Sequence, residues 1–250
     1  MHVKKIFLPA SLVCLLTVLI AIPTLKARSN KTLVKSTVVT EEKTGSKSLS
    51  AVEVASKVLY DSLKLADMGL SQDAMLMAIK GQQVLAQRGV LNKDNVVAIC
   101  DFSQSSKAKR LYIIDTKNYR VLMNTYVAHG RNSGLNYAEN FSNRPESLQS
   151  SLGFYVTKST YFGKHGLSLK LSGQENGFND KAESRAVVIH GADYIGDNRL
   201  QSPYMGRSFG CPAVPQELSA KVIDLLKDGT CLFIYSPNQA YLHGSKILNG

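Results

Sequence analysis

The sequence between residues 96 and 236 is a succession of short runs rich in β-branched and aromatic residues, separated by clusters of Asn, Gly, Asp and Ser. Runs of this kind are typical of β-strands joined by turns. The stretch with helical character in this region is 215–228 (PQELSAKVIDLLKD). We therefore expect a mainly β domain, an antiparallel β-sandwich or barrel with one helix. The runs are VVAICDF, RLYIIDT, RVLMNTYVAHG, LGFYVTKSTYFG, LSLKLSG, AVVIHGA and TCLFIYS.

Two helices are predicted before this β domain. Residues 51–66 carry apolar side chains on one face at helical spacing, and Ser71 is placed to cap a second helix, 72–88, that stops at Gly89. These helices form a small cap. We expect a helical segment at 51–92, a β domain at 93–237 and a C-terminal tail at 238–250.

The N-terminal residues differ in composition from the rest. Lys4 and Lys5 precede an uncharged stretch at 6–25, and Ala27 closes an imperfect cleavage site. This pattern predicts a cleaved signal peptide at 1–27, with an uncleaved N-terminal anchor, a membrane tether through residues 6–25, as the alternative. Residues 28–50, rich in Ser, Thr and Lys, are typical of a flexible linker. With either alternative we expect export to the periplasm or cell envelope.

The charge of the chain indicates which partners suit it. The net charge is +11, and loss of residues 1–27 would leave the chain basic. An exported basic protein suits polyanions such as a cell wall or an anionic membrane face, although a basic surface without a specific partner is the alternative. Basic clusters interleaved with aromatic residues, zinc-finger spacing and long basic runs are absent from the sequence, so we expect no nucleic acid partner.

Three cysteines remain after residue 27, and an odd number outside the cytoplasm leaves at least one thiol without an intramolecular partner. Cys100 and Cys231 lie in strand-like runs, so they are either buried small residues or partners of each other. Cys211 lies between Gly210 and Pro212, in a run too broken for a strand or helix. Such a turn presents a side chain, so Cys211 is the candidate reactive thiol.

A cysteine nucleophile needs a base and donors for the oxyanion. His190 ends a predicted strand, and Gly191 after it leaves room for a substrate backbone. We expect the N–H groups of Gly210 and Cys211 to converge as oxyanion donors, with the Ser208 hydroxyl in the same turn. A papain-type peptidase has Cys before His, whereas His comes first here.

At these residues the sequence resembles a known family. His190-Gly191 followed by Ser208-Phe209-Gly210-Cys211 resembles the signature of the L,D-transpeptidases, cysteine enzymes that cross-link peptidoglycan; its usual form is His-Gly, a spacer and Ser/Thr-His-Gly-Cys. Upstream, Ser151-Leu152-Gly153-Phe154 resembles the Thr-Pro-x-Gly-x-Phe strand of that family. The resemblance covers about residues 59–236, most of the chain after the linker.

The resemblance implies an L,D-transpeptidase-like fold and mechanism. Cys211 would be the nucleophile, His190 the base, and a backbone carbonyl near Gly191 would orient the imidazole. The enzyme would attack a peptidoglycan stem tetrapeptide between its third residue and the terminal D-Ala, and transfer the acyl group to an amine as a 3→3 cross-link. Water as acceptor would make it an L,D-carboxypeptidase. No metal or organic cofactor is implied.

The sequence departs from the family pattern around the cysteine. Phe209 replaces the usual histidine, and Pro212-Ala213 replaces a hydrophobic residue and an Asn or Arg. A non-catalytic wall-binding module is therefore an alternative, although both His190 and Cys211 are retained.

Other polar residues are candidates for substrate binding. His129, Arg131 and Ser133 lie in a polar loop that could grip carboxylates of a stem peptide, or close a hairpin. Arg207 could neutralise a substrate carboxylate, and Tyr194 with Tyr204 could form a lid. We expect Arg185 to be an exposed, solvated side chain. A zinc site built from His129, His165 and His190 is a further alternative, which no local spacing supports.

Overall fold

The computed structural model describes residues 50–250. The signal peptide or anchor predicted at 1–27, and the linker predicted at 28–50 except for its last residue, lie outside the described residues. Within 50–250, no helix combines the length and hydropathy needed to cross a membrane.

Two capped helices open the described part of the chain. α1 (Ala51–Ser62) begins at a capping box, in which the Ser50 hydroxyl accepts the Glu53 N–H and the Glu53 carboxylate accepts the Ser50 N–H. α2 (Gln72–Gln87) begins at Ser71, whose hydroxyl accepts the N–H three residues further on. Both helices lie where the sequence predicts them, although α1 ends before residue 66 because the chain turns after Ser62.

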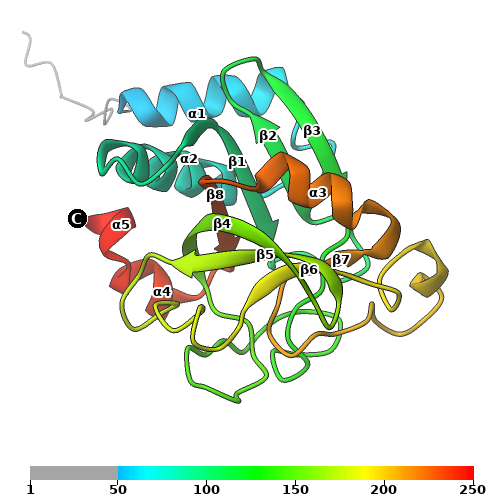
Figure 1. The fold of residues 1–250 in the computed structure, drawn as a ribbon. Coiled ribbons are helices and arrows are strands. Elements are labelled where there is room, and N and C mark those ends of the chain that lie inside the picture. Colours follow the sequence, from blue (N-terminus) through cyan, green and yellow to red (C-terminus); the bar gives the residue numbers. More distant parts are fainter. Residues whose placement is uncertain (1–49) are drawn as a thin grey trace, which may run out of the picture. The chain divides into compact units, whose positions relative to one another are not determined.

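The strands form one eight-stranded sheet in the order β3-β2-β1-β8-β4-β5-β6-β7 (Figure 1). The β1–β8 and β6–β7 neighbours are parallel, and the other neighbours are antiparallel, which confirms the mainly β, mostly antiparallel fold. The strands are β1 (Lys93–Asp101), β2 (Leu111–Asp115), β3 (Arg120–Thr125), β4 (Gly153–Gly163), β5 (Gly166–Gly173), β6 (Val188–Ala192), β7 (Ala213–Pro215) and β8 (Thr230–Tyr235).

The chain that follows β3 joins the two ends of the sheet. We call residues 126–131 the seam segment. Ala128 donates its N–H to the Ala213 carbonyl over 2.8 Å, and Ser208 donates its N–H to the His129 carbonyl over 3.0 Å. The sheet is therefore nearly closed, like a barrel. The sequence shows one strand-like run over 120–130, which the structure splits into two segments. The first, β3, pairs with β2, and the seam segment crosses to the opposite end of the sheet.

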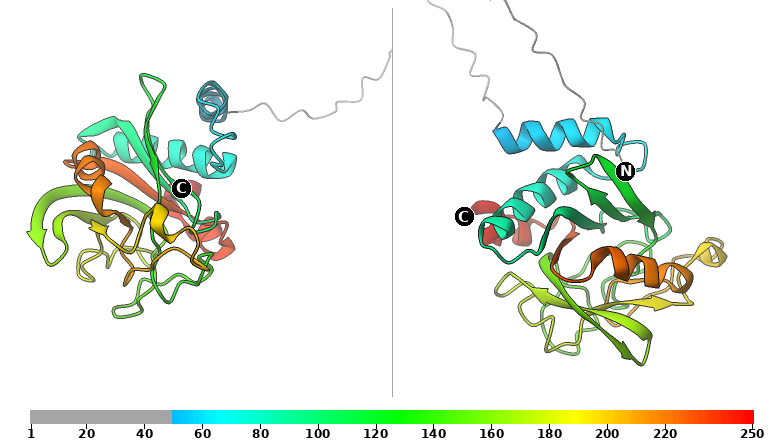
Figure 2. Two further views of the ribbon diagram at one scale, coloured as in Figure 1. Left: turned by 90° about the vertical axis from the view of Figure 1, so that its right-hand side faces the viewer. Right: turned by 45° about the horizontal axis from the view of Figure 1, so that its top comes forward.

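Helices cover the barrel on separate sides. Figures 1 and 2 show α1 on the far side of α2 from the sheet, and α2 contacts β1 and β8. The approach of α2 to the core is close at Gly81, where an added Cβ would lie 2.0 Å from the Phe154 ring. We call residues 208–212, around Cys211, the cysteine turn. The helix expected after it is α3 (Ser219–Leu226), which packs beside β5 and β6.

The predicted C-terminal tail, residues 238–250, is largely helical. Residues 238–250 contain α4 (Gln239–Gly244) and α5 (Lys246–Asn249). The buried Glu175 carboxylate attaches these helices to the sheet, because it accepts hydrogen bonds from the Tyr241 and Ser245 hydroxyls and from the N–H of Phe154 on β4. Short helices such as these leave little periodic signal in a sequence.

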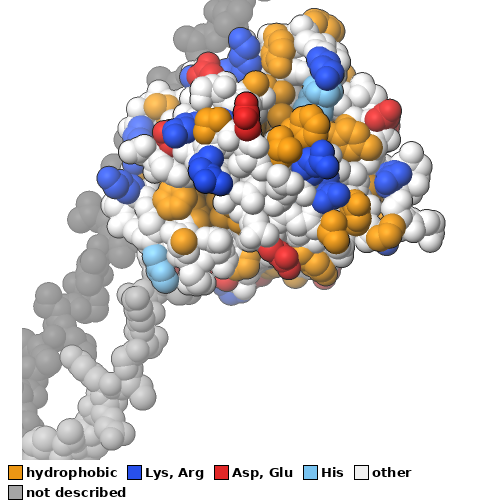
Figure 3. Space-filling model, turned by 90° about the horizontal axis from the view of Figure 1, so that it is seen from below, with side chains coloured by type: hydrophobic (Ala, Val, Ile, Leu, Met, Phe, Trp, Pro, Cys, Tyr) orange, Lys and Arg blue, Asp and Glu red, His pale blue; other side chains and the backbone are white. Residues whose placement is uncertain are grey.

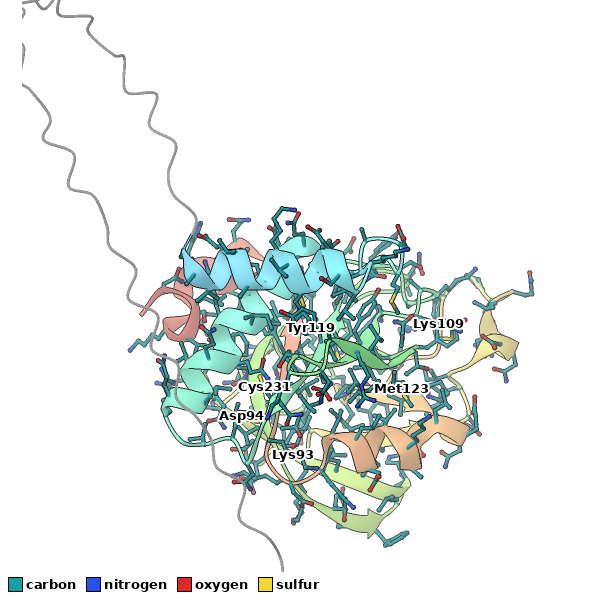
Figure 4. All side chains as sticks on the ribbon, turned by 90° about the horizontal axis from the view of Figure 1, so that it is seen from above. Lys93, Asp94, Lys109, Tyr119, Met123 and Cys231 are labelled. Carbon is teal, nitrogen blue, oxygen red and sulfur yellow. The ribbon has the colours of Figure 1, made fainter. Side chains whose placement is uncertain are left out.

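The two strand cysteines are buried and free. Cys100 lies in β1 and Cys231 in the adjacent β8, where they pair with other residues. Figure 4 labels Cys231 near Lys93, where the starts of these two strands lie side by side. Burial raises the pKa of Cys100 to about 12 and raises that of Cys231 as well. Of the two alternatives from the sequence, the structure has buried small residues.

Candidate active site

The sheet register brings the predicted nucleophile and base together. His190 lies in β6 and pairs with Ala213 of β7, two residues after Cys211. On its other side, His190 pairs with Ser168 of β5. Cys211 and His190 therefore lie on neighbouring chain segments at one end of the sheet, although 21 residues separate them in the sequence.

The His190 imidazole is buried and oriented by its own neighbour. Its Nδ1 lies 2.8 Å from the Gly191 carbonyl oxygen, so Nδ1–H donates to that carbonyl and Nε2 carries the lone pair. This is the orienting contact that the family resemblance implies. Burial lowers the pKa of His190, the Gly191 carbonyl opposes this, and the neighbouring His165 lowers the pKa further. A neutral imidazole with a free Nε2 can accept a proton.

His165 is a residue of the site for which the sequence suggested only a metal-binding role. It lies in the turn between β4 and β5, and its ring stacks on that of His190 with centroids 4.2 Å apart and an interplanar angle of 21°. The described residues contain no group of three or more His, Cys, Asp and Glu side chains that could hold a metal ion. The zinc alternative therefore has no geometric support in this part of the chain.

The Cys211 thiol is half-buried and donates to the Ala186 carbonyl oxygen over 3.7 Å. Burial raises the pKa of Cys211, and the Val188 N–H and the Arg185 charge oppose this rise. The thiol is thus a neutral donor in this structure.

Hydrogen bonds within the cysteine turn define which oxyanion donors are available. The Ser208 hydroxyl donates to the Cys211 carbonyl over 2.6 Å and accepts the Gly210 N–H over 3.0 Å. The Gly210 N–H is therefore engaged by Ser208 in this structure, and its role as an oxyanion donor stays a prediction. Gly210 also supplies the turn with a φ of 126° and a close approach to Gln149. The Cys211 N–H donates to no backbone carbonyl among the described residues, and its interaction with the Cys211 sulfur lowers the pKa of the thiol.

Arg185 has a structural role that the sequence did not reveal. We expected an exposed side chain, yet its guanidinium is half-buried and donates to the carbonyls of Ser142 and Gln149 and to the hydroxyl of Ser147. It therefore fixes the loop beneath the cysteine turn and places a positive charge near the thiol. An arginine without a surrounding motif gives no sequence signal for such contacts.

Two residues predicted to bind substrate are fully buried. His129 and Ser133 have no exposed surface. His129 Nδ1 lies 2.8 Å from the buried Arg110 guanidinium and its Nε2 lies 3.3 Å from the Gly134 carbonyl, while the Ser133 hydroxyl accepts the Ser150 N–H. The predicted contact of His129 and Ser133 with substrate is therefore wrong, because both side chains hold loops together.

The other predicted binding residues do come together. Arg131, Arg207 and Tyr194 line one open pocket, which also includes Tyr204 and Phe209. Phe209, which stands where the family has a histidine, has 68% of its surface exposed. On the face drawn in Figure 3, Lys and Arg side chains lie scattered among hydrophobic and uncharged ones, with few acidic side chains between them.

A protein-family comparison identifies the family of the chain. A model of the L,D-transpeptidase catalytic domain matches residues 66–235, which is more than half of the chain. The chain belongs to the L,D-transpeptidase catalytic domain family. A comparison with curated proteins gave no match.

Solved structures give distant similarities. An L,D-transpeptidase from Mycobacterium smegmatis is 12% identical, with 57% of this chain and 59% of that chain covered and a TM-score of 0.35. L,D-transpeptidase 3 from Mycobacterium tuberculosis is 12% identical, with 57% and 61% covered and a TM-score of 0.34. An L,D-transpeptidase from Stackebrandtia nassauensis is 15% identical, with 74% and 92% covered and a TM-score of 0.33. The chain thus spans less than two thirds of the two mycobacterial structures, and the family assignment rests on the family match.

Proposed function

We propose that this chain is an exported cysteine L,D-transpeptidase that acts on peptidoglycan stem peptides. The observation that carries the proposal is the pairing of His190 beside the cysteine turn, with Nδ1 held by the Gly191 carbonyl and Nε2 free. This is the arrangement that a cysteine acyltransferase requires. The export proposal is supported by the composition of residues 1–27.

The first half-reaction forms a thioester. His190 Nε2 takes the Cys211 thiol proton, and the thiolate attacks the carbonyl of the third stem residue. The Cys211 N–H, which donates to no backbone carbonyl among the described residues, can stabilise the oxyanion. As the C–N bond breaks, His190 returns the proton to the leaving D-Ala amine, so that the acyl group remains on sulfur.

The second half-reaction releases the acyl group. An amine from another stem attacks the thioester carbonyl and gives a proton to His190, and the C–S bond breaks as the amide forms. Cys211 is regenerated when the proton returns to its sulfur. Water in place of the amine would give hydrolysis, which is the L,D-carboxypeptidase alternative, and no metal or organic cofactor is needed for either outcome.

Intact-mass measurement of the full chain after incubation with a disaccharide-tetrapeptide tests this proposal. We expect an acyl adduct on the unmodified protein with release of D-Ala, and neither with Cys211→Ala. A dimeric muropeptide product would identify transpeptidation, and a tripeptide product would identify hydrolysis. Absence of adduct and of D-Ala release, while Cys211 still reacts with an alkylating agent, would overturn the proposal in favour of a wall-binding module.

A further inference from the structure

An open pocket beside the cysteine turn gathers arginine side chains from three parts of the chain. One comes from the seam segment, one from the short 3-10 helix η1 (Asp197–Arg199), and one from the residues just before the cysteine turn. The pocket has a volume of about 280 Å³ and no Asp or Glu lines it. We call it the arginine pocket, and its side chains are Arg131, Arg199, Arg207, Tyr194, Tyr204 and Phe209.

The positive charge in the arginine pocket is not neutralised by the protein. None of the ion pairs among the described residues involves its three arginines. Arg207 donates to the carbonyls of Arg131 and Gly134, over 2.8 and 3.1 Å, and its guanidinium lies 4.6 Å from the Tyr204 ring centroid. These neutral partners hold the side chain in place and leave its charge for a ligand.

Arg199 adds an independent observation, a side-chain donor without a partner. Its Nε is buried and has no hydrogen-bond partner among the described residues. A buried N–H without a partner is costly, and natural proteins seldom leave one. The nearest acid in its own helix, Asp197, already accepts the Tyr126 hydroxyl over 2.7 Å.

The arginine pocket is directly linked to the reactive turn. The Arg131 N–H donates to the Ser208 carbonyl over 2.8 Å, and Phe209 forms a wall of the pocket two residues before Cys211. A guanidinium group matches a carboxylate with two parallel hydrogen bonds. An anion held in the pocket would therefore approach the nucleophile from the N-terminal side of its turn.

We propose that the arginine pocket binds a carboxylate of the donor stem peptide and thereby positions the scissile carbonyl at Cys211. This inference rests on the proposed function, and it adds Arg199 as a specificity-determining residue. Phe209 supplies an apolar wall at the position where the usual signature has histidine. The carboxylate has two sources in a stem tetrapeptide: the terminal D-Ala, or an acidic residue within the stem.

Binding of synthetic tetrapeptides to the full chain with Cys211→Ala, which prevents turnover, tests the pocket. One peptide has free carboxylates, a second has a C-terminal carboxamide, and a third has its internal carboxylates amidated. In the same background we would compare Arg199→Gln and Arg131→Gln with Arg88→Gln, an exposed arginine at the end of α2 that serves as the matched control. Circular dichroism would verify folding; Arg131 is exposed, so its substitution is expected to leave the fold intact.

We expect each pocket substitution to weaken binding of the free-carboxylate peptide about tenfold, and Arg88→Gln to leave it unchanged. One amidated peptide should bind the parent protein about tenfold more weakly and show no further loss with Arg199→Gln. Whichever amidated peptide behaves in this way lacks the carboxylate that the arginine pocket binds, and so identifies it.

Two outcomes would overturn the inference: equal binding of all three peptides, or losses in Arg199→Gln and Arg131→Gln no larger than in Arg88→Gln. A second measurement, D-Ala release from the tetrapeptide by the protein with Cys211 intact, distinguishes failure of the pocket proposal from failure of the proposed function. D-Ala release without dependence on the arginines would refute the pocket alone. Arginine-dependent binding without D-Ala release would refute the enzymatic function alone, and absence of any binding would refute the pocket proposal.

Discussion

Acidification should destabilise this fold through His129. Burial and the adjacent Arg110 charge lower the pKa of His129 from 6.5 to about 4. Above pH 6.5 the imidazole is neutral in both the folded and the unfolded chain, so its full contribution to stability is present. Below pH 6.5 the unfolded chain gains a proton that the folded chain does not accept, so stability falls until the pH reaches about 4.

The size of this effect follows from the shift in pKa. One pKa unit corresponds to about 1.4 kcal/mol, so lowering the His129 pKa from 6.5 to about 4 costs about 3 kcal/mol of the free energy of unfolding once the pH has fallen to 4. That is a large part of the stability of a typical domain. The imidazole has no exposed surface, so solvent does little to reduce this cost.

Urea unfolding followed by circular dichroism between pH 7 and pH 4 would measure this dependence. We would compare the parent chain with His129→Gln, whose amide can accept from Arg110 and donate to the Gly134 carbonyl but cannot titrate. The free energy of unfolding of the variant should fall less steeply with acid, by up to about 1.4 kcal/mol per pH unit. His190, whose pKa is also lowered, and Glu175, whose pKa is raised, are common to both proteins and cancel in the comparison. Parallel pH dependences would refute the reasoning.

Three further predictions concern the core and the thiol. Gly81→Ala should lower the free energy of unfolding by about 1–3 kcal/mol, measured by urea titration, because the new methyl group would overlap the Phe154 ring; unchanged stability would contradict the close packing. Arg185→Gln should move the pH midpoint of Cys211 alkylation upward, because removing the positive charge disfavours the thiolate; Arg185→Lys, which keeps the charge, should move it less, and an unmoved midpoint in the Gln variant would exclude electrostatic support. Iodoacetamide should label Cys211 in the folded chain and the two strand cysteines only after unfolding; early labelling of either would show that the strands open.

α1, α2, α3 and most of the strands could be predicted from the sequence because their signals are local. Ser50 and Ser71 cap helices, and the alternation of apolar runs with turn residues predicts a sheet. The strand order could not be predicted in this way. β7 has three residues and follows Pro212, too short a run to show a pattern, and β3 shares an uninterrupted run with the seam segment although the two pair with different partners. Such pairings depend on contacts between residues far apart in the sequence.

The residues of the candidate site also divide into those that a local sequence signal marks and those that only the fold brings together. Cys211 and His190 were identifiable because their immediate neighbours are unusual and resemble a family signature. His129 shared the same His-Gly pattern, and its burial against Arg110 could not be read from residues adjacent to it. Arg199 and Arg185 had no motif to mark them, because their roles arise from loops that the fold brings together.

The position of β8 determines when this molecule can assemble. β8 comes last among the strands in the sequence but lies between β1 and β4, so it joins β1–β3 to β4–β7 within the sheet, while the seam segment joins the two outer ends. During synthesis, the gap between β1 and β4 cannot be filled until residues 230–235 have left the ribosome. Until then β1 and β4 each have one unpaired edge. The sheet is therefore fully paired only after nearly the whole chain has been made.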